Sequence, residues 1–101
     1  MVTAAEFDHL AQSLDGVVSK PHFDRRAYAV KRNFATLAGD GASANLLFTP
    51  DEQDMRCALH PGVLTPVPNK WGERGWTTLR LEGADAELTL ALLQAARAHA
   101  G

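Results

Sequence analysis

The chain has 101 residues, of which 46% are hydrophobic and 22% are charged, and its formal net charge is −2 at pH 7. This length supports one domain with a single core and excludes two, and the composition excludes an intrinsically disordered chain. The acidic net charge argues against a protein whose affinity comes from neutralising many nucleic-acid phosphates.

The first predicted helix begins at a capping box, Thr3-Ala4-Ala5-Glu6, whose Thr and Glu side chains accept hydrogen bonds from each other's backbone N–H groups. Gly16 suits the left-handed position that ends many helices. Between them, apolar side chains recur at helical spacing at Phe7, Leu10, Ala11 and Leu14. The sequence therefore predicts a helix between Thr3 and Gly16.

The pattern then changes to that of β-strands. Four short segments are predicted as strands, namely residues 17–19, 27–31, 34–37 and 45–48. The first of them is an edge strand that precedes Pro21. Arg32-Asn33 predicts a tight turn, and residues 39–43 predict a longer loop that contains glycine. These segments together predict a meander of antiparallel strands.

A second capping box, Thr49-Pro50-Asp51-Glu52, predicts another helix, with proline at the first helical position where it is favoured. His60-Pro61-Gly62 ends this helix. Residues 76–81 are rich in β-branched and aromatic side chains and predict a further strand. Asp85 starts a third helix, which runs nearly to the C-terminus.

The predicted order of elements is α-β-β-β-β-α-β-α, in a single domain that spans residues 1–101. An antiparallel sheet with one apolar face buries that face when helices pack on it. We therefore expect an α+β fold, a two-layer sandwich with the helices on one face of an antiparallel β-sheet.

Residues 66–78, the tryptophan loop, hold both tryptophans, two prolines and two glycines. Prolines restrict the backbone and glycines allow conformations closed to other residues, so this composition predicts a loop with one defined shape. Trp76 begins a predicted strand, which favours a role in anchoring the loop to the core. Trp71 fits anchoring and stacking on a base equally well.

Several segments resemble, in order and spacing, the MmcQ/YjbR family of small bacterial proteins. The resemblance rests on His22-Phe23-Asp24-Arg25-Arg26-Ala27-Tyr28, Phe34-Ala35-Thr36-Leu37, Phe48-Thr49-Pro50-Asp51-Glu52-Gln53, Pro66-Val67-Pro68, Trp71-Gly72 and Gly75-Trp76-Thr77. It implies the CyaY-like fold, which is similar to frataxin and agrees with the layout above. It also implies DNA binding, a label that rests largely on the fold.

The distribution of charge is more favourable to DNA binding than the net charge. Residues 17–37 carry a net +4 and residues 69–80 a net +2, while the remaining segments together carry −8. If the two basic segments adjoin, they form a basic patch with aromatics. Its candidate nucleic-acid-binding residues are Arg25, Arg26, Lys31, Arg32, Lys70, Trp71 and Arg74. The alternative is that these cations only decorate exposed strands and turns.

A second hypothesis is a non-enzymatic adaptor that binds a protein or a small ligand in a groove. The groove would form between the tryptophan loop and residues 22–28, with candidate residues His22, Tyr28, Asn69 and Trp76. The acidic net charge favours this alternative. Either DNA or another protein is therefore a candidate partner, and a monomer is favoured.

Catalytic and metal-binding patterns are weak in this sequence. His22 and Asp24 have no nucleophile beside them, and the other histidines are scattered without zinc spacing. Gly39-Asp40-Gly41 joins two strands and has no following helix to receive a phosphate. We expect no catalytic residue, no metal site and no cofactor.

The N-terminal segment has neither the positive nor the apolar region of a signal peptide, and no uncharged apolar run approaches the roughly 20 residues of a membrane span. The single cysteine, Cys57, permits no internal disulfide and agrees with a reducing compartment. It is interpreted as a packing residue of a helix. We therefore expect a cytoplasmic protein with no membrane partner.

Overall fold

The computed structural model describes residues 1–100. Its centre is an antiparallel sheet of six strands in the order β1-β2-β3-β4-β6-β5. The strands are β1 (Val18–His22), β2 (Arg25–Ala29), β3 (Asn33–Leu37), β4 (Ser43–Leu47), β5 (Leu64–Pro66) and β6 (Trp76–Arg80). The helices are α1 (Ala4–Gln12), α2 (Pro50–Leu59), α3 (Lys70–Glu73) and α4 (Ala86–Arg97), with a 3₁₀ turn η1 (Leu81–Gly83).

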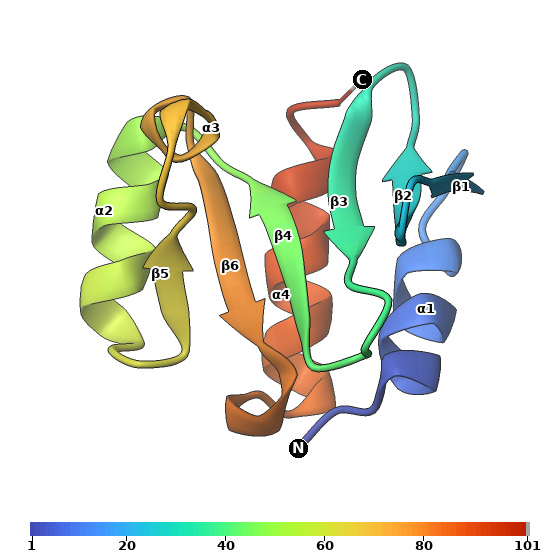
Figure 1. The fold of residues 1–101 in the computed structure, drawn as a ribbon, viewed down its shortest axis with the longest axis horizontal. Helices are drawn as coiled ribbons and strands as arrows, with labels where there is room; N and C mark the ends of the chain where they lie inside the picture. The colour runs from blue at the N-terminus through green and yellow to red at the C-terminus, as the bar shows by residue number, and fades with distance from the viewer. Residues whose placement is uncertain (101) are drawn as a thin grey trace.

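The helices α1 and α4 cover one face of the sheet and leave the other face open (Figure 1). Helix α2 lies beside β5, at the edge of the sheet. The predicted α+β two-layer sandwich is therefore confirmed. Within residues 1–100, every helix is too short or too polar to span a bilayer.

Local chemistry explains where the helices begin. Both predicted capping boxes form, at Thr3 with Glu6 and at Thr49 with Glu52. Asp85 caps α4 by accepting a hydrogen bond from the N–H of Leu88. These contacts satisfy N–H groups that have no partner within the helix.

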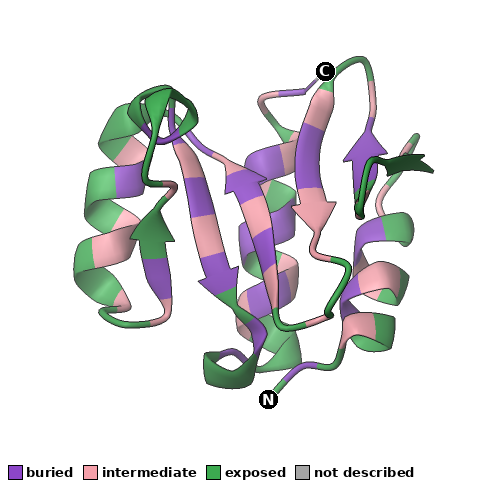
Figure 2. Cartoon of the chain, viewed as in Figure 1, coloured by how far each residue is buried: buried purple, intermediate pink, exposed green. Residues whose placement is uncertain are grey.

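The register of the sheet sorts side chains between its two faces. Tyr28 pairs with Ala35, and Ala35 pairs with Leu46, in a row that faces the helices and is fully buried. The neighbouring row contains Thr36 and Asn45 and faces the open side, because successive side chains in a strand point to opposite faces. Figure 2 shows the resulting alternation of buried and less buried residues along β4 and β6.

The structure contains two elements that the sequence did not predict, β5 and α3, and both lie at or within the tryptophan loop. They have three and four residues, too few for a periodic pattern. Strand β1 is also longer than predicted and runs through Pro21. Proline is tolerated there because β1 is an edge strand.

Candidate ligand groove on the open face of the sheet

A groove of about 430 Å³ lies on the open face of the sheet. Its floor is formed by side chains of β2, β3 and β4, namely Arg25, Asn33, Thr36 and Asn45. One wall is the tip of the β1–β2 hairpin, with His22 and Phe23. The opposite wall is the tryptophan loop, with Val67, Asn69, Trp71 and Trp76.

Hydrogen bonds between neighbouring strands hold the polar groups of the floor. The Nε of Arg25 donates to the hydroxyl of Thr36 at 2.9 Å, and its Nη2 donates to the carbonyl oxygen of the same residue at 3.4 Å. The hydroxyl of Thr78 on β6 donates to Oδ1 of Asn45 at 2.9 Å. The floor therefore presents a fixed guanidinium and a fixed amide rather than mobile side chains.

The short helix α3 presents Trp71 at the rim of the groove. Oδ1 of Asn69 caps this helix by accepting a hydrogen bond from the backbone N–H of Trp71 at 2.9 Å. The indole of Trp71 is 56% exposed, and the guanidinium of Arg74 lies 5.2 Å from the centroid of its ring. An exposed indole of this kind is available to stack on a ligand.

Gln53 of α2 holds the tryptophan loop in place. Its Nε2 donates to the carbonyl oxygens of Gly72 at 3.0 Å and Trp76 at 2.9 Å, and it also lies 3.2 Å from the hydroxyl of Thr77. Gln53 is nearly fully buried. The sequence analysis did not identify it as a site residue. The available signal was its spacing of four residues from Cys57, which places both side chains on the inner face of α2.

The two glycines of the tryptophan loop lie where no side chain fits. A Cβ atom on Gly72 would come within 1.8 Å of the carbonyl oxygen of Val67. One on Gly75, whose φ is +108°, would come within 1.8 Å of the carbonyl oxygen of Phe48. The predicted single shape of the loop thus has a steric cause.

The opposite wall presents an unusual residue at its tip. Phe23 has a φ of 59° and is 94% exposed, although bulky residues rarely adopt this left-handed backbone conformation. Its ring meets that of His22 edge to face, with 4.9 Å between centroids. A strained and exposed aromatic beside a groove is typical of a contact residue rather than of a packing residue.

The structure separates the predicted nucleic-acid-binding residues. Arg25 and Trp71 line the groove, and Arg74 packs on Trp71 at its rim. Lys70 is exposed at the first position of α3 but does not line the groove. Arg26 points to the helix-covered face, where it lies 3.7 Å from the carboxylate of Asp8.

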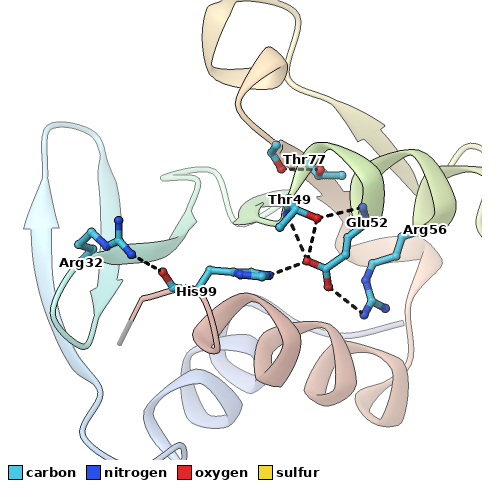
Figure 3. Close-up of polar contacts among 7 residues, drawn as sticks. Arg32, Thr49, Glu52, Arg56, Thr77 and His99 are labelled. Carbon is cyan, nitrogen blue, oxygen red and sulfur yellow. Dashed lines mark hydrogen bonds and ion pairs between the residues drawn. The ribbon is translucent and has the colours of Figure 1, made fainter.

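Lys31 and Arg32 lie in the β2–β3 connection, beside the end of the chain that follows α4. Their backbone N–H groups both donate to the carbonyl oxygen of Ala100. The guanidinium of Arg32 donates to the carbonyl oxygen of His99 at 2.9 Å (Figure 3). The seven candidates therefore do not all face the groove, because adjacent residues in the sequence face opposite sides of a strand or lie at opposite ends of one.

Of the residues predicted for a ligand groove, His22, Asn69 and Trp76 do line it. Trp76 is also partly buried, in agreement with the anchoring role that its position favoured. Tyr28 does not line the groove and is corrected here, because it belongs to the row that faces the helices. Its hydroxyl donates to Oδ1 of Asp8 at 2.7 Å, and burial together with this carboxylate raises the pKa of the phenol.

A second polar cluster joins the start of α2 to the end of α4. Nε2 of His99 lies 2.6 Å from Oε1 of Glu52, and the guanidinium of Arg56 lies 3.8 Å from the other carboxylate oxygen (Figure 3). Burial opposes ionisation of Glu52, but hydrogen bonds from Thr49 and His99 outweigh it and hold the pKa of this carboxyl below its usual value. None of these side chains lines the groove, so the cluster serves the fold.

The thiol of Cys57 is partly buried, and burial together with the nearby charge of Asp54 raises its pKa. A thiol with a raised pKa is a poor nucleophile at neutral pH. This environment agrees with the packing role interpreted from the sequence.

No family model matches the chain, and no curated protein matches it. Among solved structures, the fold is similar to the crystal structure of protein DR2400 from Deinococcus radiodurans, which carries a DUF419 domain. The TM-score is 0.78 at 22% sequence identity, over 95% of this chain and 76% of that one. DUF419 is the YjbR/MmcQ-like family, so the similarity supports a related fold.

Proposed function

We propose that the protein is a non-enzymatic module that binds single-stranded nucleic acid in the groove on the open face of its sheet. The observation that carries this proposal is the pair of exposed aromatics, Phe23 and Trp71, on opposite walls of a groove whose floor holds Arg25. Aromatic side chains stack on bases, and a cation between them attracts the phosphates.

The charges that line the groove favour an anionic ligand. Among the described residues that line it, Arg25 is a cation and none is an Asp or a Glu. The volume of about 430 Å³ lies in the range of about 300 to 1,000 Å³ that is usual for ligand pockets. A pocket of this size suits one or two unstacked nucleotides.

A single strand is favoured over duplex DNA because the basic residues do not share one surface. Arg26 pairs with Asp8 on the helix-covered face, and Arg32 lies beside the end of α4. A duplex whose bases remain stacked needs many phosphate contacts for its affinity, and the bases of a single strand are free to stack on aromatics. We also propose that the protein is a member of the MmcQ/YjbR family and is located in the cytoplasm. The family implies DNA binding in general, and this proposal restricts it to single-stranded nucleic acid.

The test titrates the protein with a single-stranded oligonucleotide of about ten nucleotides, and separately with a duplex of the same length, at several salt concentrations. Tryptophan fluorescence reports the binding. We expect quenching and tighter binding by the single strand. Arg25→Gln should weaken binding and reduce the slope of log K against log salt by about 0.7, the share of one phosphate contact on a single strand. Lys31→Gln removes the same charge outside the groove and should change neither quantity.

Non-specific binding already reaches a dissociation constant of about 100 μM at physiological salt. A dissociation constant for the single strand above about 100 μM at low salt therefore overturns the proposal. Equal effects of Arg25→Gln and Lys31→Gln overturn the assignment to the groove.

A second candidate is an adaptor that binds a protein, and the 94% exposure of Phe23 together with the net charge of −2 favours it. A pull-down from bacterial lysate with and without nuclease separates the two candidates. A protein partner held by this surface survives digestion and is lost with Phe23→Ala, whereas a complex bridged by nucleic acid is lost on digestion.

A further inference from the structure

His22 is a histidine on the wall of the groove whose ring nitrogens have no partner within the protein. The residue is exposed and lines the groove. Its imidazole meets the ring of Phe23 edge to face, with 4.9 Å between centroids. Within residues 1–100, the ring of His22 makes no hydrogen bond and no ion pair, unlike that of His99, which lies 2.6 Å from Glu52. Both ring nitrogens of His22 are therefore available to a ligand.

Arg25 lies directly across from His22 on the neighbouring strand. The two residues form the last pair of the register between β1 and β2. Residues that lie opposite each other in antiparallel strands point to the same face of the sheet, and both of these side chains line the groove. The contacts of Arg25 with Thr36 occupy Nε and Nη2 but not Nη1. An imidazole and a guanidinium with a free donor thus adjoin where the hairpin wall meets the floor.

The charged groups around His22 favour an anion at this position. Lys20 lies two residues before it on β1 and faces the same side of the sheet, and Arg25 lies opposite. Asp24 follows in the turn, but among the described residues it neither pairs with the imidazole nor lines the groove. The groove-lining residues of β3, β4 and the tryptophan loop are all uncharged, namely Asn33, Thr36, Asn45, Val67, Asn69, Trp71 and Trp76.

We infer that protonated His22 is a second phosphate-binding group of the groove, beside Arg25, and that the bound single strand takes up a proton there. This inference rests on the proposed binding of single-stranded nucleic acid. Imidazole is the side chain whose charge changes between about pH 5 and pH 8, and its protonated form donates from both nitrogens. Like charges that lie opposite each other in a sheet repel, whereas a phosphate between His22 and Arg25 attracts both. Protonation and binding of the strand therefore favour each other.

The experiment measures binding of oligodeoxythymidine of about ten nucleotides by tryptophan fluorescence, at about pH 5.5 and about pH 8 and at several salt concentrations. Neither thymine nor the phosphodiester titrates in this range, so a pH dependence of binding comes from the protein. We expect the wild type to bind at least about fivefold more tightly at the lower pH, the effect of one charge-assisted contact. The slope of log K against log salt should steepen there by about 0.7, the share of one phosphate contact on a single strand.

Three variants assign this effect to His22. His22→Gln should bind with the same affinity and the same salt slope at both pH values. His22→Lys is charged at both pH values and should bind tightly, with the steeper slope, at both. His9→Gln removes a histidine that is exposed on α1, away from the groove, and should keep the pH dependence of the wild type. Circular dichroism at both pH values verifies that each variant is folded.

Binding by the wild type that is equal at the two pH values overturns the inference and leaves the proposed function standing. A pH dependence that persists in His22→Gln also overturns it, because another group would then take up the proton. Failure of the oligonucleotide to bind at either pH overturns the proposed function and the inference with it.

Discussion

The side-chain amide of Gln53 on α2 donates a hydrogen bond to the carbonyl oxygen of Trp76 at 2.9 Å, and a second one to that of Gly72. The buried side chain of Gln53 thus joins α2 to both ends of the segment from Gly72 to Trp76. These contacts hold the backbone on the C-terminal side of Trp71, whose own side chain is 56% exposed.

Gln53→Leu should destabilise the protein by about 1 to 2 kcal/mol, because the carbonyl oxygens of Gly72 and Trp76 each lose one donor, although each keeps a backbone N–H donor. Urea unfolding followed by circular dichroism measures this change. Gln94→Leu, an exposed position of α4, is the matched control and should change stability by less than about 0.5 kcal/mol. Similar losses in both variants would contradict the role of Gln53.

Gly75→Ala should cost more than about 4 kcal/mol or prevent folding, because the added Cβ would lie 1.8 Å from the carbonyl oxygen of Phe48. Gly62→Ala separates this clash from backbone strain, since Gly62 also has a positive φ, +78°, but no atom within 4 Å of the added Cβ. It should cost only about 1 to 2 kcal/mol. Thermal and urea unfolding measure the loss of stability in both variants. Equal losses in Gly75→Ala and Gly62→Ala would show that backbone strain alone, and not the clash with Phe48, causes the destabilisation.

Phe23→Gly should leave the stability of the protein unchanged or raise it by up to about 1 kcal/mol. Glycine relieves the left-handed strain of about 1 to 2 kcal/mol, and its greater freedom in the unfolded chain offsets part of this gain. The same variant should weaken binding of single-stranded oligonucleotide, because a stacking wall is lost. A clear loss of stability would mean that Phe23 packs in the fold, in conflict with its 94% exposure.

Stability should fall in acid as Glu52 becomes protonated. The pKa of this carboxyl is lower in the folded protein than the ordinary value of a glutamate in the unfolded chain, so its contribution to stability is complete above that ordinary value and is lost as the pH falls through the folded pKa. Urea unfolding at a series of pH values should show a shallower acid limb for Glu52→Gln than for the wild type. Glu87→Gln, an exposed position of α4, is the control, and equal slopes in the two variants would contradict the role of Glu52.

The helix starts and the fold class could be predicted because they depend on local chemistry. The capping boxes at Thr3 and Thr49 join residues three apart, and the alternation of apolar residues is visible within single strands. Strand β5 could not be predicted in this way. It exists because Thr65 pairs with Thr78 across the sheet, and no pattern within three residues reveals a distant partner.

The sequence predicted part of the candidate site, and the residues that it assigned wrongly have one cause in common. Arg25 and Arg26 are neighbours in the sequence and were assigned to one basic surface, yet the pleat of β2 sends the first to the groove and the second to Asp8. Tyr28 was assigned to the groove for the same reason of proximity, and the pleat places it against the helices.

The sequence by itself determined the three longer helices, the class of fold and the single shape of the tryptophan loop, because caps, periodicity and the steric limits of proline and glycine act over a few residues. Only the tertiary structure decided that Phe23, Arg25, Asn45 and Trp71 line one groove. These residues come from four segments, and it is the strand order and register of the sheet that place them together.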